Sequence, residues 1–473
     1  MREATRIIAC VMTAVLAVAG TAGAAKEKPL PKELPPYGQD RPLPVPNIVN
    51  VGMDNGLTVW VVPRTGFPKV TAILAVRGGT AADPEKLAGT ADVLADVVKE
   101  GTTRLSSRQI AEELQAVGGE ISTNASDDAV YVSVDGLAPG TAKVLEILAD
   151  VARNAAFPGN EVELAKANTL QGLLARESTP EFAVDKVFSN AVFGAHPYRT
   201  VAPTKEAVEA LTPQTLLEQY RRRFRPDRAL LVVVGDVDAQ RTGDTVKRLF
   251  GTWKGQGDTA PATPPAPAGG TAQVLVVDRP GSVQSEIRVG RATVKATDPE
   301  YFPEIVANTV FGGAFSSRLV ENIREDKGYT YSPSSRVSAY EEGGMLRIRA
   351  AVRNDVTAGA LLEIFYELDR MGATLPTDDE LARAKRYQSG LFLLRNSTQG
   401  ALASTLATNW VNGLPPAALA EFVPKVNSVT AEQVREVGRK LFTSRSQTVV
   451  IGGDAKKVAA DIVQFGEAKP ANP

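Results

Sequence analysis

The chain has 473 residues, of which 43% are hydrophobic and 23% are charged, a globular composition that excludes an intrinsically disordered or collagen-like chain. Lysine and arginine number 53 against 54 for aspartate and glutamate, so no overall charge points to nucleic acid. One histidine and one cysteine exclude most zinc, iron and copper sites and most hydrolytic centres that depend on an imidazole.

The first 24 residues have the pattern of a secretory signal peptide. Two arginines precede an apolar run over residues 7–19, and small residues with the spacing that signal peptidase requires follow it. We predict cleavage after Ala24 and export to the periplasm. We expect the single cysteine, Cys10, to be removed with this segment. The run is shorter than the ~20 residues that span a bilayer, and no later stretch is a candidate, so no transmembrane segment is expected.

Two proline-rich segments divide the remaining chain. Residues 25–47 show little apolar periodicity and predict an extended lead-in. Residues 255–272 have the same composition and predict a linker between two modules of similar size, residues 48–254 and 273–465. Residues 466–473 then form a short tail.

The two modules look like copies of one unit. In both, a helix-like stretch leads to a phenylalanine, then to an apolar strand that ends in Gly-Asp, at a constant offset along the sequence. The first copy has Thr212, Phe224, Gly235 and Asp236, and the second has Thr430, Phe442, Gly453 and Asp454. A duplicated module is the simplest explanation.

Strand and helix patterns alternate along the first module. Residues 57–62 and 71–76 predict strands, and alternating valines predict another at 130–134. A capping box at Ser106 starts a helix that ends at two glycines, and residues 161–176 predict a further helix. These patterns predict an α+β fold in which helices lie on one face of a mostly antiparallel or mixed sheet.

Residues 89–102, GTADVLADVVKEGT, resemble the N-terminal signature of the pitrilysin (insulinase-like) metallopeptidases. That signature is H-x-x-E-H, framed by G-x-A and G-T. Here the frame is present, but Asp92 and Asp96 stand at the histidine positions and Ala95 stands at the position of the catalytic glutamate. The family's third ligand, a glutamate, falls near Gln171 or Gly172. The resemblance therefore implies a family member that has lost its zinc site.

A catalytic zinc needs about three protein ligands and a nearby carboxylate base, so we expect no metal cofactor in this chain. Two alternatives stay open for Asp92 and Asp96, which lie four residues apart on one helix face. They either hold a hard cation together with waters or form a solvated, mildly repulsive pair. The lone histidine, His196, lies in a His-Pro-Tyr sequence that resembles a family loop, and we expect it to be structural.

The second module carries a different family motif. Residues 311–319, FGGAFSSRL, and residues 322–332, NIREDKGYTYS, resemble the Ser-Arg-Leu helix, Arg-Glu pair, glycine turn and tyrosine strand of the family's second half. In the family, an arginine and a tyrosine seven residues apart reach the zinc site of the other half and hold the peptide. The matching residues are Arg324 and Tyr331. Guanidinium and phenol groups suit this role because both donate hydrogen bonds to a peptide carbonyl.

The resemblance implies two tandem homologous modules that form a half clamshell. It also implies a non-catalytic, substrate-clamping subunit that works with a zinc-bearing pitrilysin-like partner on peptide substrates. A sheet edge would pair with the peptide backbone, and the strand at residues 71–76 is a candidate edge. Two alternatives remain, a peptidase-derived scaffold or assembly protein and an independent hydrolase with other chemistry. Fold does not supply function by itself.

Overall fold

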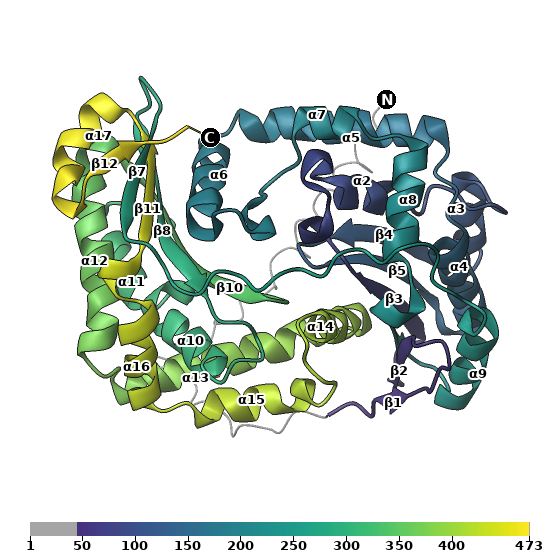
Figure 1. The fold of residues 1–473 in the computed structure, drawn as a ribbon. Coiled ribbons are helices and arrows are strands. Elements are labelled where there is room, and N and C mark those ends of the chain that lie inside the picture. Colours follow the sequence, from purple (N-terminus) through teal and green to yellow (C-terminus); the bar gives the residue numbers. More distant parts are fainter. Residues whose placement is uncertain (1–44, 473) are drawn as a thin grey trace, which may run out of the picture. The chain divides into compact units, whose positions relative to one another are not determined.

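Two six-stranded mixed sheets with helices make up the part of the chain that the structure describes (Figure 1). The structure, a computed structural model, describes residues 45–472, so the predicted signal peptide and nearly all of the lead-in lie outside the described residues. Among residues 45–472, no helix has both the length and the apolar composition that crossing a membrane requires. The predicted α+β class with two modules is confirmed.

The first sheet has the strand order β1-β2-β6-β3-β5-β4. Strands β2 and β6 are parallel, and the other neighbours are antiparallel. Its strands are β1 (Val49–Asn50), β2 (Thr58–Pro63), β3 (Lys69–Arg77), β4 (Glu120–Ala125), β5 (Ala129–Leu137) and β6 (Ala229–Gly235). The predicted strands at residues 57–62, 71–76 and 130–134 are confirmed as β2, β3 and β5.

The second sheet has the order β12-β7-β11-β8-β10-β9, in which the five strands after β12 repeat the order of the five strands after β1. Strand β7 pairs in parallel with β11 and β12, and the other neighbours are antiparallel. Its strands are β7 (Gln273–Asp278), β8 (Gln284–Thr293), β9 (Ser334–Tyr340), β10 (Gly343–Arg353), β11 (Thr448–Gly453) and β12 (Ala468–Pro470). The strands that end in Gly-Asp, β6 and β11, occupy equivalent places in the two sheets, as a duplication requires. Strand β12 lies within the segment that the sequence predicts as a tail.

The helices follow the strands in a similar order in both modules. The first module has α2 (Thr90–Val97), α3 (Ser107–Gln115), α4 (Thr141–Asn154), α5 (Gly159–Glu177), α6 (Pro180–Phe193), α7 (Lys205–Glu209), α8 (Pro213–Arg223) and α9 (Ala239–Phe250). The second has α10 (Tyr301–Asn308), α11 (Arg318–Val320), α12 (Thr357–Ala373), α13 (Asp378–Arg395), α14 (Gln399–Val411), α15 (Ala418–Ser428), α16 (Ala431–Leu441) and α17 (Ala455–Ile462). The predicted capping box of α3 is present, with Ser106 and Gln109 bonded reciprocally.

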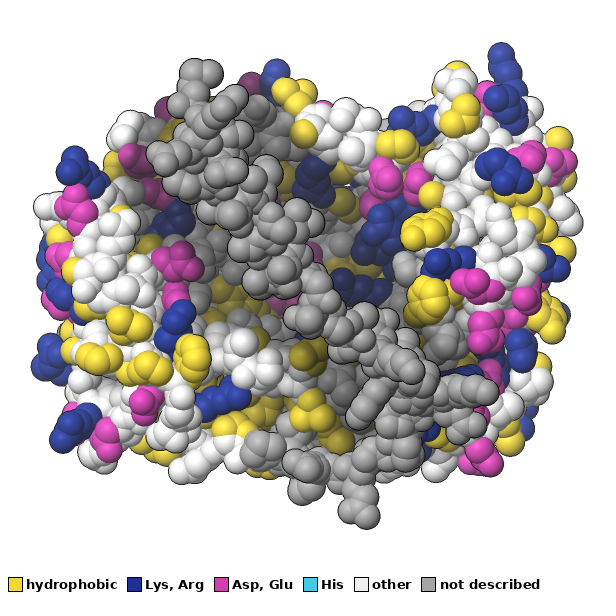
Figure 2. Space-filling model, turned by 180° about the vertical axis from the view of Figure 1, so that it is seen from behind, with side chains coloured by type: hydrophobic (Ala, Val, Ile, Leu, Met, Phe, Trp, Pro, Cys, Tyr) yellow, Lys and Arg dark blue, Asp and Glu magenta, His cyan; other side chains and the backbone are white. Residues whose placement is uncertain are grey.

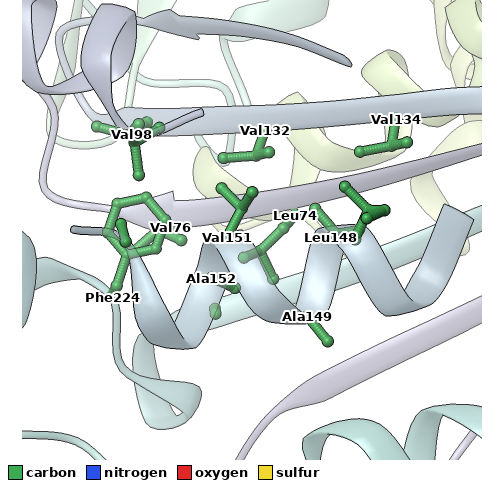
Figure 3. Close-up of a cluster of buried hydrophobic side chains, with 14 of the residues drawn as sticks. Leu74, Val76, Val98, Val132, Val134, Leu148, Ala149, Val151, Ala152 and Phe224 are labelled. Carbon is green, nitrogen blue, oxygen red and sulfur yellow. The ribbon is translucent and has the colours of Figure 1, made fainter. Parts of the chain in front are cut away.

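One face of the first sheet packs against its own module's helices. Leu74 of β3 and Val132 of β5 pack with Leu148 and Val151 of α4, and all four are fully buried (Figure 3). The α4 residues lie three apart, which places them on one side of the helix. This is the helix-covered face that the sequence predicts.

The opposite face of the first sheet is covered by a helix of the second module. Leu402 and Leu406 of α14 lie one helical turn apart and pack against Ile73 of β3 and Val232 of β6. Both faces of β6 are therefore buried, which explains why its sequence is a continuous apolar run rather than an alternating one.

The second sheet receives a helix from the first module in return. Val184 and Phe188 of α6 pack with Ala292 of β8 and Val450 of β11. Each module thus packs one of its helices against the other module's sheet, and neither apolar core is complete without the other module.

The strand at residues 71–76 is not a sheet edge, so that prediction is wrong. It forms β3, which lies between β6 and β5 in the middle of the sheet and is almost entirely buried. The edges of the first sheet are β1 and β4. Strand order depends on pairing between distant segments, and a local apolar pattern does not contain that information.

The tip of the β9–β10 hairpin is hydrogen-bonded to the first module. Asp128 accepts hydrogen bonds from the backbone N–H of Glu341 at 2.9 Å and from the hydroxyl of Tyr198 at 2.6 Å. The Tyr198 hydroxyl accepts in turn from the N–H of Glu342 at 3.1 Å. Asp128 and Tyr198 are both buried, so these bonds form a polar connection between the modules inside the protein.

His196 has the structural role that the sequence predicts. Its Nε2 donates to the carbonyl of Pro264 at 2.8 Å, and its Nδ1 accepts from the backbone N–H of Tyr198 at 3.2 Å. Both ring nitrogens are therefore used within the fold.

We expect Tyr198→Phe to lower the free energy of unfolding by about 1–3 kcal/mol, because Asp128 and the N–H of Glu342 lose a partner inside the protein. Urea unfolding of both proteins measures this change. Tyr366→Phe is the matched control, because Tyr366 is 58% exposed and its hydroxyl should contribute little. Equal losses from both substitutions would contradict this role of Tyr198.

Glu304 of α10 makes stability depend on pH. Burial raises the pKa of its carboxyl to about 8, and the nearby Arg291 offsets this only in part. The folded protein therefore keeps a proton on Glu304 that the unfolded chain releases near pH 4.5. Stability from this group is fully present below that pH and is lost as the pH rises toward 8.

We expect Glu304→Gln to remove this dependence, because glutamine does not titrate. Between pH 5 and 7, the difference in unfolding free energy between the variant and the wild type should change by about 1 kcal/mol per pH unit. Urea unfolding at several pH values measures it, with Glu112→Gln on the exposed side of α3 as the control. A difference that stays constant with pH would refute the assignment.

Candidate functional site

Helix α2 has the frame of a zinc helix without its ligands. A buried aspartate, Asp83, holds its start by accepting hydrogen bonds from the N–H groups of Gly89 and Ala91 at 2.9 and 3.1 Å. Arg223, which is fully buried, contacts the same carboxylate at 2.6 Å. Charge at a helix N-terminus and a buried ion pair fix the position of α2.

The three positions of the degenerate motif lie in different surroundings on α2. Asp92 is half-buried, Asp96 is exposed and Ala95 is buried in the first module's core. A core alanine cannot act as a base. Helix α5 packs against α2, but Gln171 and Gly172 are both exposed on α5, and neither has a carboxylate.

Several carboxyl groups influence one another near Asp92. Burial raises the pKa of Asp92, Asp96 raises it further, and Arg176 of α5 opposes the shift. Burial also raises the pKa of Asp127 to about 7, and the neighbouring Asp128 and Asp92 add to this. Burial and mutual repulsion thus disfavour the charged forms of Asp92 and Asp127 as long as no cation is bound.

The donor set does not fit a catalytic zinc. Within residues 45–472, no group of three or more His, Cys, Asp or Glu side chains is arranged to hold a metal ion. The residues at the motif's ligand positions supply two carboxylates and no imidazole.

The second-module motif brings together two exposed aromatic rings and one half-buried guanidinium. Arg324 lies in a π-helical turn, Glu321–Asp326. Its guanidinium lies 4.6 Å from the ring centre of Phe315 and 4.8 Å from that of Tyr331. The two rings are 68% and 81% exposed. We call Phe315, Arg324 and Tyr331 the aromatic–arginine cluster.

The remainder of this motif anchors the cluster in the fold. Arg318 is buried and contacts both carboxylate oxygens of Glu380, at 2.6 and 2.9 Å. Its hydrogen bonds lower the pKa of Glu380 to about 2. Leu319 and Ile323 are fully buried in the second core. The Ser-Arg-Leu sequence is thus structural, whereas Tyr331 is exposed and Arg324 is half-buried beside it.

Arg324 also forms an ion pair with Glu325 at 3.3 Å, while Tyr331 is exposed rather than packed in the sheet. Within the described residues, no hydrogen bond or ion pair joins either side chain to Asp92 or Asp96. Sequence reasoning missed Phe315 as a site residue. The available signal was its position between small residues in a glycine-rich loop, because such a loop offers few side chains that could bury an aromatic ring.

Two profiles of one peptidase family match this chain. The profile described as Insulinase (Peptidase family M16) matches residues 60–203, and the profile described as Peptidase M16 inactive domain matches residues 210–387. These matches cover most of both modules, including α2 and the aromatic–arginine cluster.

Similar proteins come from several bacteria. An uncharacterized zinc protease of Mycobacterium leprae (strain TN) is 27% identical over 375 residues, which cover 78% of this chain and 84% of that protein. Another, from Bacillus subtilis (strain 168), is 25% identical and covers 82% of this chain and 94% of that protein.

Solved structures share the fold. The crystal structure of a peptidase M16 inactive domain from Pseudomonas fluorescens has a TM-score of 0.80 at 20% identity, and covers 86% of this chain and 98% of its own. A protease from Helicobacter pylori has a TM-score of 0.78 at 17% identity, with 86% and 99% coverage.

We expect the purified chain to retain less than about 0.1 zinc per molecule after dialysis, because α2 supplies neither imidazoles nor a third ligand. Elemental analysis by mass spectrometry measures this. Asp92→Asn with Asp96→Asn is the control, and its zinc content should equal that of the wild type. One zinc per chain that the double variant lacks would show that the two carboxylates do bind metal.

Proposed function

Because the chain belongs to the insulinase peptidase family, M16, we propose that it is the non-catalytic, substrate-clamping subunit of an exported heteromeric zinc peptidase. A zinc-bearing family member would be its partner and would supply the metal and the base. The observation that carries this proposal is a contrast within one chain. Asp92, Ala95 and Asp96 replace the zinc motif, whereas Arg324 and Tyr331 are both present, the first half-buried and the second exposed.

The aromatic–arginine cluster suits a clamp on a peptide bond. A guanidinium donates several hydrogen bonds in a fixed plane, and a phenol donates one. The rings of Phe315 and Tyr331 lie against the guanidinium, which restricts its motion before a peptide arrives. Donors fixed in advance stabilise the negative charge that develops on a carbonyl oxygen during attack by water.

The proposal includes export, because the N-terminal residues have the signal-peptide pattern described above. It also requires a second subunit, since Asp92, Ala95 and Asp96 supply neither the imidazoles nor the base of the family's zinc motif. Peptides are the substrate class because the cluster's donors match backbone carbonyls, which every peptide carries.

The test compares peptide cleavage by the mature chain alone, by a zinc-bearing homologue from the same organism alone, and by their mixture. Activity should appear in the mixture and fall by about 100-fold with Arg324→Ala or Tyr331→Phe, because each removes a donor to the developing oxyanion. The loss should appear in kcat more than in KM, since the donors act chiefly in the transition state.

Arg353→Ala and Tyr366→Phe are matched controls, because both side chains are exposed and lie outside the cluster. A mixture no more active than the homologue alone, and insensitive to substitutions in the cluster, would refute the clamp. The scaffold interpretation would then replace it. Cleavage by the mature chain alone that survives chelation would instead identify an independent hydrolase.

A further inference from the structure

Arginines are concentrated on one face of the second sheet. Arg336 of β9 lies directly opposite Arg347 of β10, and Arg349 of β10 lies directly opposite Arg288 of β8. Directly paired residues of antiparallel strands point to the same face. We call Arg336, Arg347 and Arg349 the arginine strip. Like charges placed directly opposite each other repel, so the strip needs anions nearby.

The protein supplies too few acidic partners for these cations. Asp185 of α6 pairs with Arg288 at 2.7 Å and reaches Arg347 only at 3.9 Å, while Glu286 pairs with Arg288 at 3.0 Å. Within residues 45–472, Arg336 and Arg349 form no ion pair. The half-exposed Arg349 and exposed Arg336 therefore carry charge that no described acidic side chain neutralises.

Arg347 shows the resulting imbalance. Burial lowers the pKa of its guanidinium, and Arg349 and Arg288 lower it further, whereas Asp185 opposes them. Its Nε atom is buried and has no hydrogen-bond partner within the described residues, and the same holds for Nη2 of Arg288. Unpaired buried donors are costly, so this face has more donor capacity than the described acidic side chains satisfy.

The strip adjoins a cavity along the free edge of the second sheet. Strand β9 is the last strand of that sheet, and Arg336 also lines a cavity of about 1070 Å³ between β9, α10, α13, α14 and α15. Arg395 and Lys425 line the same cavity, whereas Asp298 is its only acidic lining residue among those described. Figure 2 shows Lys and Arg side chains gathered in a hollow of the face that it draws.

An edge strand can pair with the backbone of an extended peptide, which then becomes an additional strand. Alternate side chains of that peptide would share the face of Arg336 and the rest of the strip. The cavity gives the peptide space beside β9. The edge of β9 would thus bind the peptide backbone, while the arginine strip would contact every second side chain of the peptide.

We propose that the edge of β9 and the arginine strip bind extended peptide segments that carry acidic side chains at alternate positions. This inference rests on the proposed function as a peptide-binding subunit and names its substrate class. Arginine pairs with carboxylates through two parallel hydrogen bonds, so the strip favours glutamate and aspartate over their amides.

The test measures binding of labelled peptides of about ten residues to the full mature chain by fluorescence anisotropy. Three peptides share a backbone and carry Glu, Gln or Lys at every second position. At low salt, the Glu peptide should bind at least about tenfold more tightly than the Gln peptide. The Lys peptide should bind most weakly, and added salt should reduce the preference.

The double variant Arg336→Gln with Arg349→Gln should abolish the preference for Glu. Arg108→Gln with Arg383→Gln is the matched control, because it removes the same charge from two exposed arginines of α3 and α13 that have their own acidic partners. Arg336→Lys with Arg349→Lys should keep part of the preference. The lysine variant retains the charge and guards against a result caused by unfolding.

Equal binding of the Glu and Gln peptides would overturn the inference and leave the proposed clamp standing. An undiminished preference in the Gln double variant would also overturn it. Failure of all three peptides to bind would overturn the inference, whereas the proposed function would be refuted only by a mixture no more active in peptide cleavage than the homologue alone. Binding of a DNA oligonucleotide in preference to the Glu peptide would assign the strip to a nucleic acid instead.

Discussion

The exchange of helices between the two modules is the packing arrangement on which the rest of the structure depends. Helix α14 of the second module buries one face of the first sheet, and α6 of the first module buries part of the second sheet. Removing either helix would expose an apolar face of a sheet to water. This would be strongly destabilising, because apolar burial contributes about 25 cal/mol per Å² to the free energy of folding. The buried bonds of Asp128 and Tyr198 to the hairpin tip add directional polar contacts to this apolar packing.

Local sequence patterns predicted the elements well and their neighbours poorly. The capping box at Ser106 and the alternation at residues 130–134 are local signals, and both elements are where they were expected. The strand at residues 71–76 was predicted correctly, but its place in the sheet was not, because strand order follows from distant pairing. The exchange of α6 and α14 could not be predicted from the sequence either, since the apolar residues of a helix do not specify which sheet it will cover.

The degenerate zinc motif was predictable because ligand chemistry depends on residue type, and Asp92 and Asp96 can be identified without a structure. Burial and mutual charge effects were not predictable, because Asp127 reaches Asp92 only through the fold. Within the second motif, only the family resemblance distinguishes Arg324 from Arg318, and residue type does not show what each guanidinium contacts. The structure does, since one is bonded to Glu380 inside the protein and the other lies between two exposed rings.

The frame around α2 persists although its ligands are gone, because Asp83 and Arg223 belong to the core rather than to the metal site. The sole histidine of the chain is buried, and both of its ring nitrogens are occupied. No other imidazole would therefore compete for a metal ion. This protein is consequently well suited to the introduction of a histidine motif on α2, since any gain in zinc affinity could be attributed directly to the introduced side chains.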